Sequence, residues 1–317
     1  RDISARLSRA HYTRGMTDVV SAVHELPHGP LASWARPAPP PDGVLVCPPD
    51  HFDVVDVKNP HMATNVGAVD HAAARRQWDE LCAAFRAAGL RVELVAPLAG
   101  CEDMVFTANQ TLTGLDALGR PTALLSRSPH DPRRLGAAAS AAWFRPHGWR
   151  GADVFARDSL FEGGGDVVWH PGRRLAWAGH GFRSAASAHA AVSTVFECPV
   201  VSLRLVDERF YHLDTCLCPL DERAALVVTE AFDAAGLALL AAVFDELVHC
   251  DSGEAQHALA ANAVVHDGHA ILDRRAARTV RDLRDRGLAV HAVDTAEFLK
   301  SGGSVFCLKQ WLWTPRR

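Results

Sequence analysis

The stretch LFEGGGDVV (160–168) places an acidic side chain, Glu162, beside three glycines and directly before an apolar strand. Polar residues at similar intervals precede and follow it along the chain, and each one follows or interrupts an apolar strand. The intervals are 50, 53, 50, 50 and 45 residues, in the series Asn59, Asn109, Glu162, His212, Asn262 and Cys307. Self-similarity at a fixed period is the sequence signature of a repeated structural unit. We therefore predict five similar α/β modules.

Strand-like and helix-like stretches alternate between these positions. Apolar runs such as VLVC (44–47) and AALVV (224–228) have the length of strands, whereas residues 65–88 carry apolar side chains at helical spacing. The predicted helices are 65–88, 131–143, 184–196, 229–247 and 274–286. One helix beside each set of strands is typical of an α/β fold. If the modules close into a ring, their equivalent positions converge on one axis, and the six polar residues become neighbours.

The beginning of the chain differs from the rest. Residues 10–42 contain six prolines and little periodicity, which predicts an irregular segment. We therefore divide the chain into an N-terminal lead-in, 1–42, and a single domain, 43–317. Met16 is a candidate native start, in which case residues 1–15 were added to the natural chain.

Composition excludes several classes of function. The chain has 33 Lys and Arg against 37 Asp and Glu, a net charge of -4, so it offers no long-range attraction for nucleic acid or an anionic membrane. No apolar run reaches the roughly 18 residues of a membrane span, and the first residues lack the apolar region of a secretory signal. Eight scattered cysteines without a CxxC pair are typical of reduced thiols. We therefore predict a cytoplasmic protein.

Three members of the polar series have the chemistry of a nucleophilic site: Cys307, His212 and Glu162. A thiol attacks as its thiolate, and a free cysteine has a pKa of about 8.5. A nearby histidine accepts the thiol proton or stabilises the thiolate and later protonates a leaving amine, while a carboxylate orients the imidazole or binds a cationic substrate. Glycines 302 and 303 permit a strained turn beside the cysteine.

Each of these residues also has a structural interpretation. A single cysteine in an apolar stretch, or one of 17 histidines, is more often structural when taken alone. His212, Cys216 and Cys218 suggest zinc, but no second ligand pair has finger-like spacing. The triplet HLD (212–214) also occurs in metal hydrolases, but no companion Asp-x-Asp pair completes a two-metal site. The residues therefore favour a site without a bound metal.

Eight segments, taken together and in order, resemble the guanidino-group modifying enzymes of the pentein superfamily. This group includes arginine deiminases, dimethylarginine dimethylaminohydrolases, amidinotransferases and arginine dihydrolases. The segments cover roughly residues 44–310: CPPDHFDVVDVKNPHM (47–62), EDMVFTANQTL (102–112), LLSR (124–127), FEGGGDVV (161–168), GHGFRS (179–184), YHLDTCLCPL (211–220), NAVV (262–265) and SGGSVFCL (301–308). The resemblance implies a five-bladed α/β propeller with pseudo-fivefold symmetry.

The resemblance also implies the reaction, which needs no metal and no organic cofactor. Cys307 attacks the guanidinium carbon of a small guanidino amino acid and forms a covalent amidino-thioether. His212 acts as acid for the departing amine and then as base for water, and Glu162 holds the guanidinium and the imidazole. Arg183 matches an arginine that clamps the substrate α-carboxylate, for which its forked guanidinium is suited. The other implied substrate-binding residues are Asn59, Asp103, Asn109, Arg127, Asp166 and Asn262.

Asn109 bears on the choice within the group. Many relatives carry an acidic residue there, whereas the FTAN form (106–109) resembles arginine dihydrolases, which release ornithine, CO2 and ammonia. We therefore predict a hydrolase of arginine or a methylated arginine that yields citrulline or ornithine. Three alternatives stay open: an amidinotransferase using the same thioether, a metal-dependent ureohydrolase and a non-catalytic binding protein. A homodimer is also left open.

Overall fold

The computed structural model describes residues 19–155 and 159–314, and within them the strands form five small sheets. Four sheets have three strands, and the fifth has a fourth strand added at its edge. The sheets are β16-β2-β3 (Gln310–Leu312, Gly43–Val46, Arg91–Leu94), β4-β5-β6 (Thr111–Leu115, Pro121–Leu125, Arg150–Ala152), β7-β8-β9 (Val167–Trp169, Ala176–His180, Val200–Arg204), β10-β11-β12 (Leu217–Pro219, Ala224–Val227, Glu246–His249) and β13-β14-β15 (Val264–His266, His269–Asp273, Ala289–Val293). The prediction of five similar α/β modules is confirmed.

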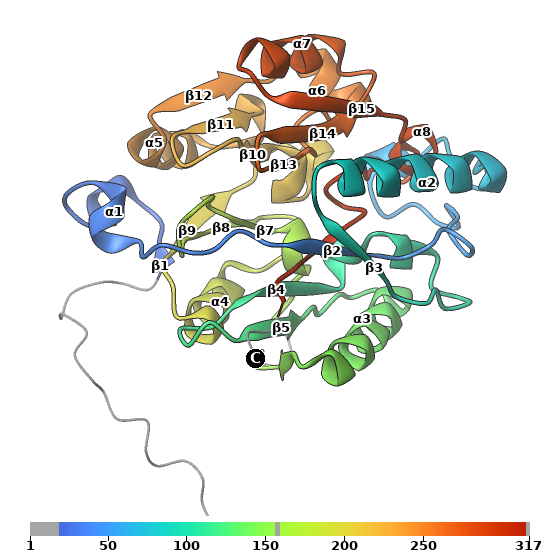
Figure 1. Ribbon diagram of the computed structural model, residues 1–317, viewed down its shortest axis with the longest axis horizontal. Helices are drawn as coiled ribbons and strands as arrows, with labels where there is room; N and C mark the ends of the chain where they lie inside the picture. The colour runs from blue at the N-terminus through green and yellow to red at the C-terminus, as the bar shows by residue number, and fades with distance from the viewer. Residues whose placement is uncertain (1–18, 156–158, 315–317) are drawn as a thin grey trace, which may run out of the picture.

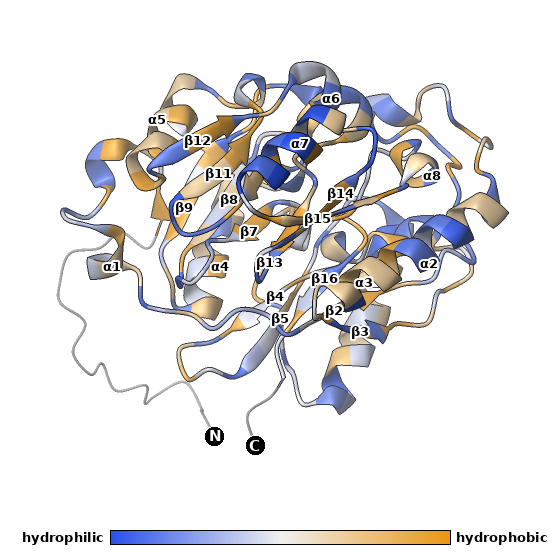
Figure 2. Cartoon of the chain, turned by 45° about the horizontal axis from the view of Figure 1, so that its top comes forward, coloured by the Kyte–Doolittle hydropathy of each residue, from blue (hydrophilic) through white to orange (hydrophobic). Residues whose placement is uncertain are grey.

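Every sheet is built by the same rule. An inner strand pairs antiparallel with a middle strand, and the middle strand pairs parallel with an outer strand. The inner strands β4, β7, β13 and β16 are labelled near the centre of the molecule in Figure 2. The repeated pattern therefore gives five blades arranged around one axis.

The ring is closed by pairing the two ends of the domain. β16, near the C-terminal end, pairs antiparallel with β2, with Gln310 opposite Leu45 and Leu312 opposite Gly43. One blade therefore contains strands from the beginning and from the end of the domain. Because Cys307 lies just before β16, this pairing also fixes the position of the predicted nucleophile relative to the other blades.

The longer helices cover the outside of the blades, as α2, α3, α4, α5 and α7 show in Figure 1. α2 begins after Asp70, whose carboxylate accepts a hydrogen bond from the Ala73 N–H, and it buries Trp78, Leu81 and Phe85 on one face. In Figure 2, α7 is largely hydrophilic in colour and β11 and β12 largely hydrophobic. The helices are α1 (Leu31–Trp34), α2 (His71–Ala87), α3 (Asp131–Phe144), α4 (His189–Phe196), α5 (Ala234–Val243), α6 (Ser252–Ala258), α7 (Ala277–Asp285) and α8 (Ala296–Leu299).

The predicted helix 229–247 is wrong at both ends. Residues Thr229–Ala231 form a 3-10 turn, and α5 begins only after Asp233, which caps it by accepting from the Gly236 N–H at 2.8 Å. The helix ends before Phe244, whose backbone is extended, and the chain then enters β12 at Glu246. The apolar composition of this stretch suits both a helix and a buried strand. The spacing of its apolar residues therefore did not show where the helix ends and the strand begins.

The predicted lead-in has some regular structure where it is described. Its first 18 residues, including Met16, lie outside the described residues. β1 (Val19–Val20) pairs parallel with β9 and so adds a strand to the third blade, and α1 follows. Within the described ranges, no helix is both long and apolar enough to cross a membrane.

Replacing Asp233 tests the capping assignment. Asp233→Ala is expected to lower the free energy of unfolding by about 1 kcal/mol, because the first turn of α5 loses the acceptor for its Gly236 N–H. Urea unfolding followed by circular dichroism measures this change. Asp233→Ser is the matched control, because serine is also a good cap. Equal losses for the two variants would show that the cap does not stabilise α5.

Candidate active site

The predicted polar series lies at one end of the inner strands. Glu162, His212 and Asn59 are the N-cap residues of short 3-10 turns, Gly163–Gly165, Leu213–Thr215 and Pro60–Met62, and Asn109 ends a fourth turn, Thr107–Asn109. Each turn except that after Asn59 leads directly into an inner strand. Asn262 and Cys307 directly precede the last two inner strands. All six side chains are buried. The period in the sequence therefore marks equivalent positions at one end of the axis.

The glycines after Glu162 are required by close packing. Gly163 has a φ of +60°, and a Cβ there would lie 2.5 Å from the carbonyl oxygen of Thr111. At Gly165 a Cβ would lie 2.2 Å from Nδ2 of Asn109. No other residue type fits these contacts, so the glycine run allows two neighbouring blades to bring Glu162 and Asn109 together.

Glu162 and His212 form a buried pair. Oε2 of Glu162 lies 2.7 Å from Nε2 of His212 and 2.6 Å from Nη1 of Arg133, and Oε1 accepts a hydrogen bond from the Ser128 hydroxyl at 2.8 Å. Burial opposes ionisation of Glu162, but Arg133, followed by His212 and Arg183, outweighs it and holds the pKa of the carboxyl well below its usual value. Glu162 is therefore an ionised group that orients the imidazole.

Cys307 has two polar neighbours. Its Sγ lies 3.1 Å from Oδ2 of Asp214 and 3.2 Å from Nδ2 of Asn262. Oδ1 of Asn262 accepts hydrogen bonds from the backbone N–H groups of Ser304, Phe306 and Cys307 and so shapes the turn that carries the sulfur. Burial, followed by the Asp214 carboxylate, raises the pKa of the Cys307 thiol well above its usual value. Without a bound cation, the sulfur is therefore a protonated thiol.

Asp214 is a site residue that the sequence reasoning missed. It is buried beside Cys307, and its Oδ1 has no hydrogen-bond partner among residues 19–155 and 159–314. Burial raises its pKa to about 7. The HLD triplet (212–214) was considered only as a metal motif, yet the 3-10 turn after His212 directs Asp214 to the sulfur. A cationic substrate would supply a positively charged partner for the Asp214 carboxylate.

Asp103 belongs to a second charged cluster. Its Oδ2 lies 3.2 Å from Nζ of Lys58 and 3.2 Å from Nε of Arg133. Burial opposes ionisation of Asp103, but Arg133 and Lys58 outweigh it and lower the pKa of the carboxyl. Arg133 also contacts Glu162, so one buried guanidinium joins the two carboxylates. Lys58 and Arg133 were not predicted, because neither belongs to the periodic series.

Arg183 and Asn59 lie at an open cavity of about 390 Å³ whose walls include Lys58 and Tyr211. The Arg183 guanidinium stacks over the Tyr211 ring at 4.7 Å, donates to the Lys58 carbonyl at 2.7 Å and lies 3.4 Å from Glu162. Nδ2 of Asn59 donates to the Tyr211 hydroxyl and to the Ser301 carbonyl. Arg183 therefore links this cavity to the buried Glu162.

Two predicted substrate-binding residues, Arg127 and Asp166, are engaged by other groups of the protein. Arg127 is partly exposed and pairs with Asp153 at 2.8 Å, so its guanidinium is engaged near the surface. Asp166 accepts hydrogen bonds from the Ser184 hydroxyl at 2.6 Å and from the Leu213 N–H at 3.3 Å. Asp166 therefore holds the segments that carry Arg183 and His212, and burial raises its pKa to about 6.

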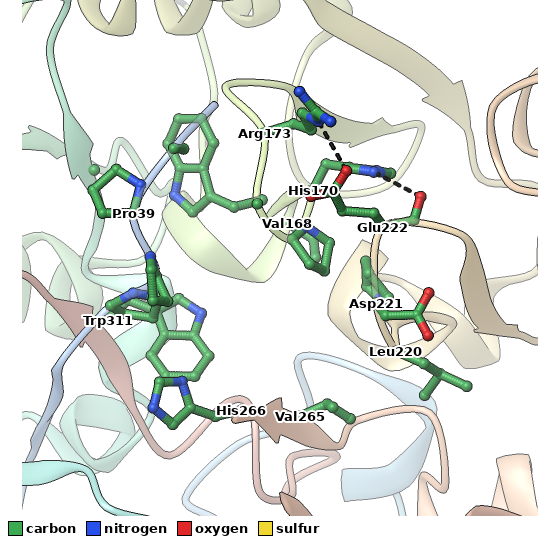
Figure 3. A pocket seen from close by; sticks show the side chains of 18 of the residues that line it. Pro39, Val168, His170, Arg173, Leu220, Asp221, Glu222, Val265, His266 and Trp311 are labelled. Atoms are coloured by element: carbon green, nitrogen blue, oxygen red, sulfur yellow. Dashed lines mark hydrogen bonds and ion pairs between the residues drawn. The ribbon is translucent and has the colours of Figure 1, made fainter. Parts of the chain in front are cut away.

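The other end of the axis has a different character. Every inner strand runs from the polar turns to a cavity of about 470 Å³ whose walls include Pro39, His170, Glu222, His266 and Trp311 (Figure 3). Arg173 pairs with Glu222 in this wall at 2.9 Å. Within the described ranges, no group of three or more His, Cys, Asp or Glu side chains is placed to hold a metal ion. His212, Cys216 and Cys218, which were considered above as zinc ligands, do not form such a group.

No family model matches the chain, but curated proteins and solved structures do. The chain is 38% identical over 269 residues to the bifunctional arginine dihydrolase/ornithine cyclodeaminase ArgZ of Synechocystis, a match that covers 84% of this chain and 37% of that protein. It is 36% identical over 299 residues to N(G),N(G)-dimethylarginine dimethylaminohydrolase of Mycobacterium tuberculosis, which covers 94% and 93% of the two chains. The chain therefore spans little more than a third of the first relative and nearly all of the second.

Solved structures give the same result. The N-terminal domain of ArgZ with bound substrate superposes with a TM-score of 0.80 at 35% identity, over 86% of this chain and 98% of that domain. A dimethylarginine dimethylaminohydrolase adduct, at 19% identity and a TM-score of 0.71, shows the fold alone. A five-bladed α/β propeller is the fold that the resemblance to guanidino-group modifying enzymes predicted. The chain belongs to the pentein superfamily of these enzymes, in the family of the M. tuberculosis dimethylarginine dimethylaminohydrolase.

Replacing Asp214 tests the electrostatics around the sulfur. Asp214→Asn is expected to lower the pKa of the Cys307 thiol, because it removes the negative charge 3.1 Å from Sγ. Alkylation by iodoacetamide at neutral pH should then be roughly tenfold faster, the effect of one pKa unit. Peptide mass spectrometry of Cys307 as a function of pH measures the rate, with Asp79→Asn on the exposed face of α2 as control. A rate that is unchanged or slower than in the wild type would contradict the assignment.

Proposed function

We propose that this protein hydrolyses the guanidino group of arginine to ornithine, CO2 and two ammonia molecules. The observation that carries the proposal is the buried arrangement in which Cys307 contacts Asp214 and Asn262 while His212 pairs with Glu162 at 2.7 Å. Both groups are held by the turns at one end of the propeller axis. A nucleophile and an acid–base pair are thereby placed beside carboxylates that suit a guanidinium.

The first half of the reaction removes one nitrogen. The guanidinium binds against Asp214 and Glu162, and its positive charge favours the thiolate of Cys307. The sulfur attacks the guanidinium carbon, and the C–N bond to one terminal nitrogen breaks as His212 donates a proton, so ammonia leaves. Water then loses a proton to His212 and attacks the amidino-thioether, and the C–S bond breaks to give a ureido group.

The second half repeats these steps on the ureido carbon. Attack by Cys307 expels the second ammonia and leaves a thiocarbamate, and water cleaves its C–S bond to give a carbamate. The carbamate loses CO2 and leaves ornithine. Two waters are consumed, which balances arginine against ornithine, CO2 and two ammonia molecules. Capture of the amidino-thioether by an amine would instead give the amidinotransferase alternative.

Asn109 supports a second round. Its side chain is buried, and Nδ2 has no hydrogen-bond partner in the part of the chain that the structure describes. An amide N–H can donate to the carbonyl oxygen of a ureido group, whereas an ionised carboxylate at that position only accepts. Asn109 therefore binds the ureido intermediate through its N–H group, whereas a carboxylate at this position would repel the ureido oxygen. The ArgZ domain with a covalently bound reaction intermediate is a relative at 35% identity that supports the thioether chemistry.

A second candidate is hydrolysis of dimethylarginine to citrulline and dimethylamine. The observation that favours it is the match to the M. tuberculosis enzyme over nearly the full length of both chains. In either case, we assign Asn59 and Arg183 to the amino-acid end of the substrate, because both line the open cavity. The cytoplasmic location, the homodimer and the division at residue 42 stay predictions.

Product analysis separates the candidates. The protein is incubated separately with arginine, monomethylarginine and dimethylarginine, and the products are identified by mass spectrometry, with Cys307→Ser as control. Ornithine from arginine supports the proposal, citrulline with dimethylamine supports the second candidate, and turnover by Cys307→Ser would refute both. Loss of activity with iodoacetamide but not with a chelator would exclude the metal-dependent alternative.

Asn109→Asp tests the second round. This variant is expected to release citrulline from arginine and to lower the ratio of ornithine to citrulline at least tenfold, because the N–H donor to the ureido oxygen is lost. The measurement is the product ratio at early times. The matched control is Gln256→Glu, an amide-to-acid change outside the site. An unchanged ratio would show that Asn109 does not hold the intermediate.

A further inference from the structure

Lys309 is a buried amine that the proposed mechanism does not use. It lies two residues after Cys307, directly before β16, and its side chain is 0% exposed. Its Nζ has no hydrogen-bond partner in residues 19–155 and 159–314. A buried amine without an acceptor destabilises a fold, and an apolar side chain of the same length would fill the space without that cost. The position therefore calls for a functional explanation.

Two aromatic rings surround the amine. Nζ lies 3.1 Å from the centre of the Phe306 ring and 4.3 Å from the centre of the Trp311 ring. Both rings also form part of the wall of the large cavity, where Figure 3 shows Trp311. The rings therefore shield the amine on the cavity side. Their faces attract an ammonium ion, so they favour the protonated form of Lys309.

The remaining neighbours are acidic groups of the site. Asp214, Cys307 and Cys218 interact with the amine electrostatically. Burial lowers the pKa of Lys309 well below its usual value, and these three groups oppose that shift. The wider charge cluster around Asp214 and Cys307 includes Asp166, Glu162, Arg133, His212, Tyr211 and Cys216. Lys309 is the member of this cluster on the side of β16.

We propose that Lys309 is a positioning residue whose protonation accompanies formation of the Cys307 thiolate. The S–H bond of Cys307 breaks, an N–H bond forms on Lys309, and the net charge of the Asp214–Cys307–Lys309 group does not change. The thiolate then interacts electrostatically with an ammonium ion as well as with the Asp214 carboxylate. Coupled groups of this kind titrate together. The inference rests on the proposed function, because it assumes that Cys307 is the nucleophile.

The coupling explains how an acidic neighbour is compatible with a nucleophilic sulfur. Asp214 alone raises the pKa of the thiol and so disfavours the thiolate. Asp214 is nevertheless well placed to bind a cationic guanidinium. An amine that takes up a proton as the sulfur loses one offsets the charge of Asp214 without occupying the substrate position.

Lys309→Met tests the proposal, because methionine keeps the apolar stem and removes the amine. The pH dependence of iodoacetamide labelling at Cys307 is measured on the full chain by peptide mass spectrometry. The apparent pKa of labelling should rise by at least one unit, so labelling at neutral pH should be at least tenfold slower. The kcat for arginine should fall with little change in KM. Lys300→Met, which breaks a partly buried ion pair with Glu297, is the matched control.

A packing role predicts a different result. If Lys309 only fills space, Lys309→Met should be at least as stable as the wild type in thermal unfolding and should label with an unchanged pH profile. That outcome would overturn the proposal. Lys309→Gln is the second variant if the methionine variant does not fold, and the same rise in apparent pKa is expected for it. Labelling needs no substrate, so absence of turnover in the wild type would refute the proposed function without deciding the role of Lys309.

Discussion

The site depends on the ion pairs and hydrogen bonds that compensate the buried carboxylate of Glu162. A fully buried charge is unstable unless ion pairs and hydrogen bonds compensate it. Arg133 from α3, His212 from the fourth blade, Arg183 from the loop after β8 and Ser128 from the segment before α3 all supply that compensation. Segments that are distant along the chain are therefore held together by one acidic group. The contact with Glu162 also orients the imidazole of His212.

The site divides its carboxylates into two kinds. Glu162 and Asp103 share the Arg133 guanidinium, and their pKa values are lowered. Asp166 and Asp214 form no ion pair with an Arg or Lys side chain of residues 19–155 or 159–314, and burial raises their pKa values to about 6 and about 7. Glu162 and Asp103, whose charges are balanced by Arg133, stabilise the arrangement of the site. Asp214, whose carboxylate has no such ion pair, is suited to bind a cation. This division supports the proposal that the substrate is a guanidinium, which carries a delocalised positive charge.

The sequence predicted the blades and most of the site for one physical reason. A polar residue precedes each inner strand and recurs at about the length of one blade, so Asn109, Glu162, His212, Asn262 and Cys307 could be found by spacing alone. Asn59 extends the same spacing by one interval, although it precedes no inner strand. Arg133 could not, because it lies on a helix and reaches the axis through a long side chain. Asp214 was overlooked because it lies in the same turn as His212 and so does not form a separate member of the periodic series. Arg127 and Asp166 were assigned by resemblance, and their contacts depend on tertiary packing that no local pattern records.

The two ends of the axis are coupled by short strands. The inner strands span three to five residues, which at about 3.3 Å per residue separates the polar turns from the aromatic cavity by roughly 10 to 17 Å. At that separation, a side chain packed against the cavity wall is still close enough to affect charges at the turns. Phe306 and Trp311 have this position, since they line the cavity and also surround the amine of Lys309. In the proposed mechanism, the aromatic end of the propeller therefore provides the low-dielectric surroundings of Lys309, and the reactivity of Cys307 depends on side chains on both sides of it.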